Sequence, residues 1–177
     1  MKYLVVIDMQ NDFIDGKLGS REAQAIVPAS KKVLDEARKD ENTKIIFVKD
    51  THSNDYFFTY EGQKYPSHCI KNTTGWKVPE GLYVDGDHTV EKGSYGFTKW
   101  DEEIVDPEEI SIMGRCTDTC VIVNTMVLRT LFPSVKINLI ANCCAGTSAE
   151  KHEAALKVAE SCQIDVIYKY DMPKWMY

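Results

Sequence analysis

The sequence predicts a doubly wound α/β fold with a mainly parallel sheet, and two observations lead to this prediction. Short β-branched runs alternate along the chain with segments of helical period, and those runs are apolar almost throughout. Parallel strands that helices cover on both faces have this continuous apolar character, whereas strands with one solvated face alternate. A repeated order of strand, helix and strand is typical of a doubly wound sheet.

Apolar runs mark the expected strands. They are residues 3–7, 44–48, 109–113, 135–141 and 164–168. A shorter extended stretch, Thr89–Glu91, directly precedes Lys92. The stretch between residues 51 and 88 is different, because it is rich in glycine, asparagine, proline and aromatic residues and contains at most one short strand. A loop of that length inside a compact domain is usually functional.

Helical periodicity fills the gaps between the strands. In the first helix one face carries Ile26, Ala29, Val33, Leu34 and Ala37, and Pro28 leaves the start of this helix open. The segment 118–132 is apolar almost all round and stops at Pro133, which predicts a buried central helix.

The last predicted helix repeats the same apolar spacing near the end of the chain. Its apolar positions are Ala155, Val158, Ala159 and Cys162, the last of which we expect in the core. Thr147 and Glu150 have the spacing of a capping box at its start. The length of 177 residues suits one domain, 1–177, with one long irregular insertion at about 51–88.

Composition narrows the class of protein. Hydrophobic residues make up 44% of the chain and charged residues 27%, the balance of a soluble globular protein. The net charge of −6 argues against nucleic acid or an anionic membrane as a partner, and no apolar run is long enough to span a bilayer. Because the chain reaches acidic Asp8 almost at once, it does not begin like a signal peptide. We therefore expect a cytoplasmic protein whose six cysteines are reduced.

Reactive side chains follow the predicted strands. Asp8 comes directly after the first strand, Asp50 and His52 follow the second, and Cys120 lies just past the strand that ends near Gly114. Ligands of open parallel sheets bind beyond the carboxyl ends of the strands. We therefore expect these side chains to meet on one rim of the sheet, together with Lys92.

Cys120 is the candidate nucleophile. It sits in a strand-to-helix turn, with Thr117 or Asp118 as the expected N-cap, so that the helix dipole and the Lys92 ammonium would favour a thiolate. The alternative is a small buried hydrophobe, the commoner role of a cytosolic cysteine. Three other cysteines have weaker claims to reactivity: Cys69, Cys143 and Cys144.

Asp8 and Lys92 each allow a second interpretation as well. An acidic residue after a buried strand is often only a turn or cap residue, and most lysines are solvated surface charges. Beside a thiol and an amide, however, Asp8 can take the thiol proton and later deliver it to departing ammonia.

Asp50, His52 and His68 form a candidate metal site. A carboxylate and two imidazoles can hold a divalent cation, and alternation in an extended segment puts residues 50 and 52 on the same side. We expect zinc, with manganese and iron as alternatives, because oxygen and nitrogen ligands suit all three. The competing interpretation is a set of unrelated polar loop residues, and His88 and His152 are expected to be structural.

Three blocks of residues together resemble a known family. Asp8-Met9-Gln10-Asn11-Asp12-Phe13, then Lys92, then Gly114-x-Cys116-Thr117-Asp118-x-Cys120-Val121 are similar to the isochorismatase-like cysteine hydrolases. Asp50-x-His52 and Pro66-Ser67-His68-Cys69, followed by Thr74-Gly75, resemble the nicotinamidase branch of that family. The blocks occur in the right order, which is far more specific than any one of them.

The resemblance implies a three-layer α/β/α fold with a six-stranded sheet and a catalytic triad of Asp8, Lys92 and Cys120. It also implies that backbone N–H groups of Cys116 and Cys120 form an oxyanion hole beside a cis peptide bond between Arg115 and Cys116. The metal ligands of the family correspond to Asp50, His52 and His68. Phe13 resembles the aromatic residue that packs on the substrate ring, and Tyr95 is the second expected substrate contact.

Three departures from the family pattern bear on the substrate. Arg115 stands where the family usually has a small or apolar residue, and Asn142 stands where many relatives carry aspartate. The loop 53–64 lacks the aromatic-proline pattern that is common around the metal pair of nicotinamidases.

The predicted function is hydrolysis of a small carboxamide, nicotinamide to nicotinate and ammonia, through a thioester at Cys120. Alternatives are a different small amide, ureide or enol ether as substrate, or a non-catalytic binding module of the same fold. A phosphoacceptor receiver would leave Cys120 and the histidines without a role, and no Gly-x-Gly-x-x-Gly follows the first strand. The expected partner is a small amide, with no nucleic acid or membrane, and the aromatic tail Tyr168–Tyr177 suits packing in a homo-oligomer.

Overall fold

A computed structural model describes residues 1–168 and contains a six-stranded sheet in which every pair of neighbours is parallel. The strand order is β3-β2-β1-β4-β5-β6. The strands are β1 (Lys2–Ile7), β2 (Thr43–Asp50), β3 (His88–Lys92), β4 (Glu109–Arg115), β5 (Lys136–Ala145) and β6 (Asp165–Ile167). This confirms the predicted fold class. Of the aromatic tail expected to contact a partner subunit, only Tyr168 is among the described residues.

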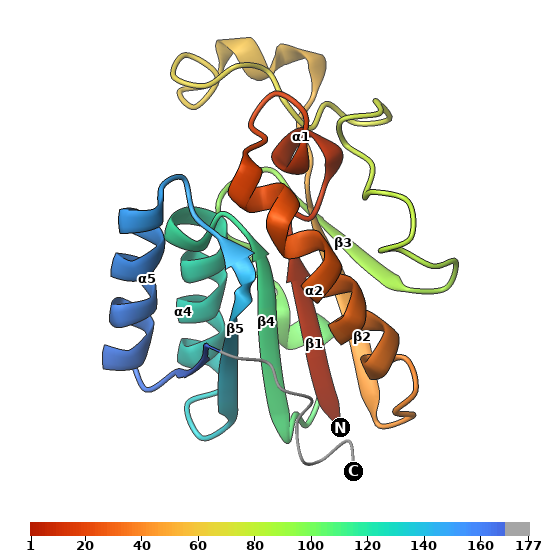
Figure 1. Cartoon of the computed structure of the whole chain (residues 1–177), viewed down its shortest axis with the longest axis vertical. Coiled ribbons are helices and arrows are strands. Elements are labelled where there is room, and N and C mark those ends of the chain that lie inside the picture. The colour runs from red at the N-terminus through yellow and green to blue at the C-terminus, as the bar shows by residue number, and fades with distance from the viewer. Residues whose placement is uncertain (169–177) are drawn as a thin grey trace.

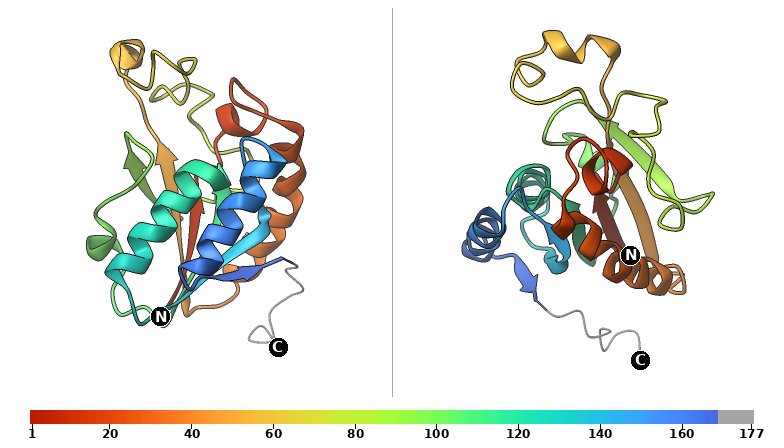
Figure 2. Two further views of the ribbon diagram at one scale, coloured as in Figure 1. Left: turned by 90° about the vertical axis from the view of Figure 1, so that its left-hand side faces the viewer. Right: turned by 45° about the horizontal axis from the view of Figure 1, so that its top comes forward.

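Helices cover both faces of this sheet (Figures 1 and 2). They are α1 (Asn11–Ile14), α2 (Arg21–Ala37), α3 (Trp100–Glu103), α4 (Ile122–Leu131) and α5 (Ala149–Ser161). α2 lies over one face, and α4 and α5, which contact each other, lie over the other. The result is the three-layer arrangement that right-handed crossovers between parallel strands produce. No helix of residues 1–168 is long and apolar enough to cross a membrane.

The central strands are buried on both faces. Val5, Val6 and Ile7 of β1 have no exposed surface, and Ile110, Ile112 and Met113 of β4 are equally enclosed. This double burial is the physical reason for the continuous apolar runs in the sequence.

Four predictions about the helices required correction. Pro28 lies inside α2, which starts earlier than the apolar face indicated, with Ser20 as its N-cap. The N-cap of α5 is Ser148, whose side chain accepts from the Lys151 N–H, rather than Thr147. Cys162, expected in the core, is only half-buried.

The fourth correction concerns the segment 118–132, which we expected to be one buried helix. It begins with a π-helical turn, Thr117–Val121, and continues as α4. One face of α4 reaches solvent at Val123 and Leu131, which are 37% and 40% exposed. Because that exposed face also carries apolar residues, the sequence pattern wrongly predicted burial all round the helix.

The first part of the predicted insertion, 51–88, projects above the carboxyl ends of the strands, and its last part runs back down beside the sheet to the start of β3 (Figure 1). Apart from a short 3-10 turn, Asn54–Phe58, and isolated bridges, it is irregular until β3 begins at His88. The His52 N–H donates to Cys69 O at 3.0 Å and the Lys71 N–H donates to His52 O at 2.9 Å. These bonds fasten the middle of the insertion beside the end of β2.

Candidate active site

Cys120 lies in the π-helical turn that follows β4. The N-cap of this turn is Cys116, and no side chain caps it, so neither Thr117 nor Asp118 has the predicted capping role. Asp118 instead accepts from the Thr147 N–H at 2.7 Å, which ties the turn to the segment before α5. Cys120 itself is 6% exposed and lines a pocket at the sheet edge.

Asp8, Lys92 and Cys120 come together in space, as the rim argument expected. Lys92 Nζ lies 2.8 Å from Asp8 Oδ2 and 3.5 Å from Cys120 Sγ. All three side chains are buried, and Asp8 adopts the left-handed backbone conformation with φ of 47°. The Asp8 carboxyl interacts through hydrogen bonds with both the Cys120 and the Lys92 side chains. It is therefore in direct reach of the thiol whose proton it would accept.

Burial controls the protonation of the pair. It raises the pKa of Asp8 to about 6, and the Lys92 charge only partly opposes this effect. Burial also raises the pKa of Cys120 well above its ordinary value, and the Asp8 charge adds to this rise against the effect of Lys92. Lys92 does lower the pKa of Cys120, as expected, but burial and the Asp8 charge outweigh it, so the expected thiolate is not favoured in the free protein. The resting pair is a neutral thiol beside a carboxylate.

The Arg115–Cys116 peptide bond is cis, as the resemblance implied. Cys116 and Cys120 both line the pocket, so the turn presents its backbone where a carbonyl oxygen of a ligand would lie. The role of their N–H groups as an oxyanion hole stays a prediction. Gly114, just before the cis bond, has φ of +127°, and a Cβ there would lie 2.0 Å from Ile7 O. β4 thus passes β1 too closely for any side chain at this position.

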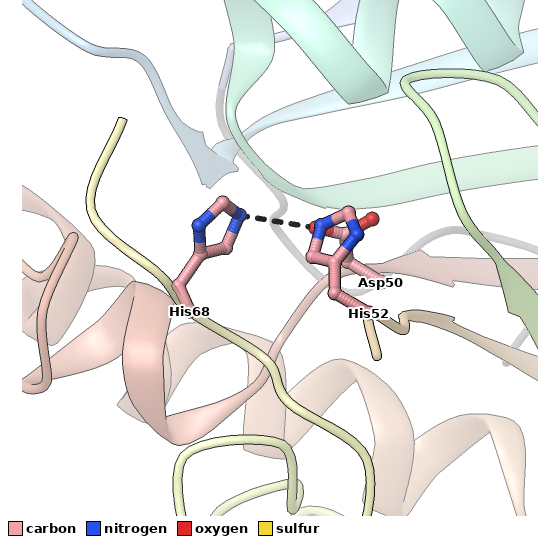
Figure 3. Close-up of side chains that lie close together, drawn as sticks. All are labelled: Asp50, His52 and His68. Carbon is pink, nitrogen blue, oxygen red and sulfur yellow. Dashed lines mark hydrogen bonds and ion pairs between the residues drawn. The ribbon is translucent and has the colours of Figure 1, made fainter. Parts of the chain in front are cut away.

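Asp50, His52 and His68 gather at one point, as expected (Figure 3). Asp50 Oδ2 lies 2.9 Å from His52 Nε2 and 3.2 Å from His68 Nε2. Asp50 Oδ1 accepts from Lys92 Nζ at 3.0 Å, so one carboxylate joins the two clusters. Burial alone would raise the pKa of Asp50, but hydrogen bonds from the two histidines and the Lys92 charge hold it well below the usual range.

The donor set fits a divalent cation. One ligand atom from each of the three residues can be chosen so that all lie within 4.8 Å of one another, and all three side chains are buried. His68 Nδ1 lies 2.9 Å from Pro66 O, an arrangement in which Nδ1 carries the proton and Nε2 is left to bind the ion. Carboxylate and imidazole ligands suit zinc, and also manganese or iron.

Two buried residues that hold this site in place were not assigned a role from the sequence. Gln10 donates to Asp50 O at 2.8 Å and accepts from the Asp50 N–H at 2.7 Å, which fixes the end of β2. Asp12 Oδ2 accepts from the Cys69 N–H at 2.8 Å and so anchors the loop that carries His68. Both lie in the block that carried the family resemblance, which was the one available signal.

The pocket has a volume of about 280 Å³. Its walls include the expected substrate contacts Phe13 and Tyr95, of which Phe13 is buried with its ring edge-on to His68 at 5.3 Å. Sequence reasoning missed Glu61 and Tyr65, which reach the pocket from the insertion. The other lining residues are Leu18, Gly19, Ser20, Asp50, His68, Ser94, Arg115, Cys116, Thr119, Cys120 and Thr147.

The remaining candidates lie outside this pocket. His88 pairs with Glu103 at 2.6 Å at the surface, and His152 Nδ1 lies 2.8 Å from Thr117 Oγ1 behind the turn. Cys143 and Cys144 are buried in β5, and all six cysteines are free thiols.

Comparison with known proteins points to one family. The chain is 26% identical to the nicotinamidase of Schizosaccharomyces pombe, over 95% of this chain and 93% of the relative. A solved nicotinamidase/pyrazinamidase from Bacillus subtilis superposes with a TM-score of 0.81 at 25% identity, over 94% of this chain and 98% of that one. The pyrazinamidase of Pyrococcus horikoshii, solved in complex with zinc, gives a TM-score of 0.80 at 22% identity, with the same coverage.

The model of the isochorismatase domain matches residues 2–169. This match includes the described strands and every residue of the candidate site. The chain therefore belongs to the isochorismatase domain family.

Proposed function

We propose that this protein is a cysteine amidohydrolase that cleaves a small carboxamide through a thioester at Cys120, with nicotinamide as the first substrate to test. The observation that carries the proposal is the buried contact of Lys92 Nζ with Asp8 Oδ2 and Cys120 Sγ at the wall of a pocket. The nicotinamidases among the relatives support the choice of substrate.

Attack begins with proton transfer within the Asp8–Cys120 pair. At neutral pH the Asp8 carboxylate, whose pKa is about 6, takes the proton of the neutral thiol as the sulfur attacks the amide carbonyl. The N–H groups of Cys116 and Cys120 stabilise the oxyanion, each by about 2.7–4 kcal/mol. Lys92 offsets the negative charge that Asp8 and the sulfur together carry.

Collapse of the tetrahedral intermediate breaks the C–N bond, and the Asp8 carboxyl returns its proton to the departing ammonia. Asp8 next takes a proton from a water molecule that attacks the thioester carbonyl, and it returns this proton to the Cys120 sulfur as the C–S bond breaks. The products are a carboxylic acid and the free thiol. Phe13 forms the wall on which the ring of the substrate lies, and Tyr95 contacts it from the solvent side.

Asp50, His52 and His68 would hold a divalent ion, with zinc as the first choice and manganese or iron as alternatives. Such an ion supplies a Lewis acid that polarises a bound water or a substrate atom. The chain itself orients the ligands through the Pro66 carbonyl and Gln10.

The direct test is ammonia release from nicotinamide by wild type, Cys120→Ala and Cys162→Ala. We expect Cys120→Ala to lose turnover, and Cys162→Ala, which changes a half-buried cysteine at the end of α5, to keep it. Unchanged turnover in Cys120→Ala would refute the thioester route.

The substrate is tested separately with pyrazinamide and carbamoyl compounds. If nicotinamide releases no ammonia but another amide does so in a Cys120-dependent reaction, that amide becomes the proposed substrate. If no amide releases ammonia and the protein is folded, the binding-module alternative is favoured.

A further inference from the structure

Arg115 is a buried cation at the wall of the pocket. It is 2% exposed, it ends β4 next to Cys116, and it lines the pocket together with Leu18 and Ser20. Its guanidinium donates to Ser20 Oγ at 2.9 Å and to Leu18 O at 3.4 Å. These two acceptors belong to the pocket wall, so the charged group lies beside the space where a ligand would bind.

The guanidinium is poorly satisfied by the described part of the chain. It offers five N–H donors, yet its partners there are the two oxygens of Ser20 and Leu18 and the Cys116 side chain, a weak acceptor, and Nε has no partner. Within residues 1–168 no carboxylate oxygen lies within 4.0 Å of it. A buried charge without a paired anion is costly, so this arrangement favours an anion that arrives from outside the chain.

Two other arginines show how this chain otherwise satisfies a guanidinium. Arg38 forms an ion pair with Asp87 at 2.5 Å. Arg129 pairs with no carboxylate of residues 1–168, and its Nε also lacks a partner, but its terminal nitrogens donate to four backbone carbonyls, those of Phe132, Pro133, Val135 and Gln163. Arg115 has neither kind of partner set, although it is the most buried of the three.

The surroundings of Arg115 include a helix N-terminus on one side and acidic side chains on the other sides of the pocket. α2, a helix of 17 residues, begins at Arg21, directly after Ser20, and its N-terminal end adds to the positive potential. The acidic Asp50 on the metal side of the pocket is already paired with Lys92 and the two histidines. Glu22, in the first turn of α2, is exposed and interacts with Arg115 only at a distance beyond an ion pair, and Glu61 lines the pocket from the insertion. An anion at Arg115 therefore meets a buried cation that has no ion pair within residues 1–168.

We propose that Arg115 binds a carboxylate of the substrate, so that the pocket prefers small amides that carry a carboxylate over neutral amides. A planar guanidinium matches a carboxylate through paired N–H···O bonds. The preference in turnover rests on the proposed amidohydrolase function, whereas the preference in binding does not. The reaction is balanced by water alone: the amide C–N bond breaks, a C–O bond forms, and a dicarboxylate and ammonia result.

Binding to the Cys120→Ala variant tests the proposal without turnover. The probes are succinamate and butyramide, which have nearly the same length and differ in the carboxylate. Titration calorimetry should show succinamate binding roughly 10- to 100-fold more tightly, the range of hydrogen bonds to a charged group. Equal affinity for the two probes would overturn the proposal, and this measurement needs no change at Arg115.

Substitution assigns the preference to one residue. In the Cys120→Ala background, Arg115→Gln should lower succinamate affinity to that of butyramide, and Arg115→Lys should restore part of the difference. Arg21→Gln is the matched control, because it removes the same charge from an exposed position near the same helix end and should leave the preference unchanged. A preference that survives Arg115→Gln in folded protein would contradict the assignment.

Turnover separates this inference from the proposed function. Wild type should hydrolyse 5-carbamoylnicotinate with a higher kcat/KM than nicotinamide, since the two differ by one ring carboxylate. If neither amide is hydrolysed but succinamate still binds through Arg115, the proposed chemistry fails and the anion site stands. If nicotinamide is hydrolysed and Cys120→Ala binds both probes equally, the chemistry stands and the anion site fails.

Discussion

Asp8 is enclosed on every side, and its environment fixes the pH at which the proposed reaction runs. Because burial raises the pKa of Asp8 to about 6, we expect kcat/KM to fall as the pH drops below about 6, where the carboxylate becomes protonated and cannot take the thiol proton. Asp8→Asn should lower kcat by roughly 10²- to 10⁴-fold at pH 7.5. A pH profile of ammonia release with both proteins measures this, and a flat profile between pH 5 and 8 would exclude Asp8 as the base.

The raised pKa of Asp8 also predicts that protonation of this residue lowers activity without unfolding the protein. The pKa of Asp8 is about 6 in the folded chain and 3.8 for an unperturbed aspartate, so the folded state favours the protonated form. The contribution of Asp8 to stability is therefore fully present below pH 3.8 and is lost as the pH rises to about 6. Circular dichroism at pH 5 should show an intact fold while activity is low.

The location of the site residues could be predicted from the sequence, whereas their protonation states could not. The rule that ligands bind beyond the carboxyl ends of parallel strands brought Asp8, Lys92 and Cys120 to one edge from sequence order alone. The thiolate expectation failed because the pKa of Cys120 depends on burial and on Asp8, and neither is visible before the chain is folded. Gln10 and Asp12 were missed as anchors for the same reason: their partners are backbone groups far away in sequence.

The turn after β4 depends on Gly114. We expect Gly114→Ala to reduce the free energy of unfolding by about 3 kcal/mol, because φ of +127° is unfavourable for alanine and its Cβ would collide with Ile7 O. Gly81→Ala is the control, since Gly81 also has a positive φ of +85° but no atom within 4 Å of the added Cβ. It should cost only about 1–2 kcal/mol. Urea unfolding of both variants measures the difference. Equal losses in the free energy of unfolding would mean that the close approach of β4 to β1 does not exclude a side chain at Gly114.

Strands were easier to locate than helix ends. Double burial makes the central positions of β1 and most of those of β4 apolar, so the sequence marks these strands within a few residues. Helix limits depend on single hydrogen bonds, and the choice between Thr147 and Ser148 as the cap of α5 is not evident from spacing. The π-helical turn at Thr117–Val121 has no periodicity of its own and could not be predicted.

For the molecule as a whole, the metal site links stability to the concentration of free ion. If Asp50, His52 and His68 bind zinc, zinc at 100 times its dissociation constant should add about 2.7 kcal/mol to the free energy of unfolding. His68→Ala should lose this response, whereas His88→Ala, which changes a surface histidine paired with Glu103, should keep it. Thermal unfolding with zinc and with a chelator tests this, and an identical zinc response in His68→Ala would exclude the assigned ligand.

The organisation of the whole chain was predictable in outline. The order of elements follows from alternating strand and helix patterns, and the insertion was recognised by its composition. The way Glu61 and Tyr65 fold back onto the pocket depends on contacts that no sequence pattern encodes.

We propose that residues 1–177 form one domain that acts on a small amide and, with a net charge of −6, does not act on nucleic acid. Association into a homo-oligomer stays a prediction, which sedimentation of the purified protein tests.

The insertion has a consequence for how new specificities arise on this scaffold. It carries His68, Glu61 and Tyr65, while the proposed triad stands on the sheet and on the turn after β4. The two histidine ligands and part of the entrance thus lie on one contiguous stretch, whereas Asp50 and the nucleophile lie outside it. Grafting that stretch between family members should transplant both traits in a single exchange and leave the bond-breaking machinery in its original setting.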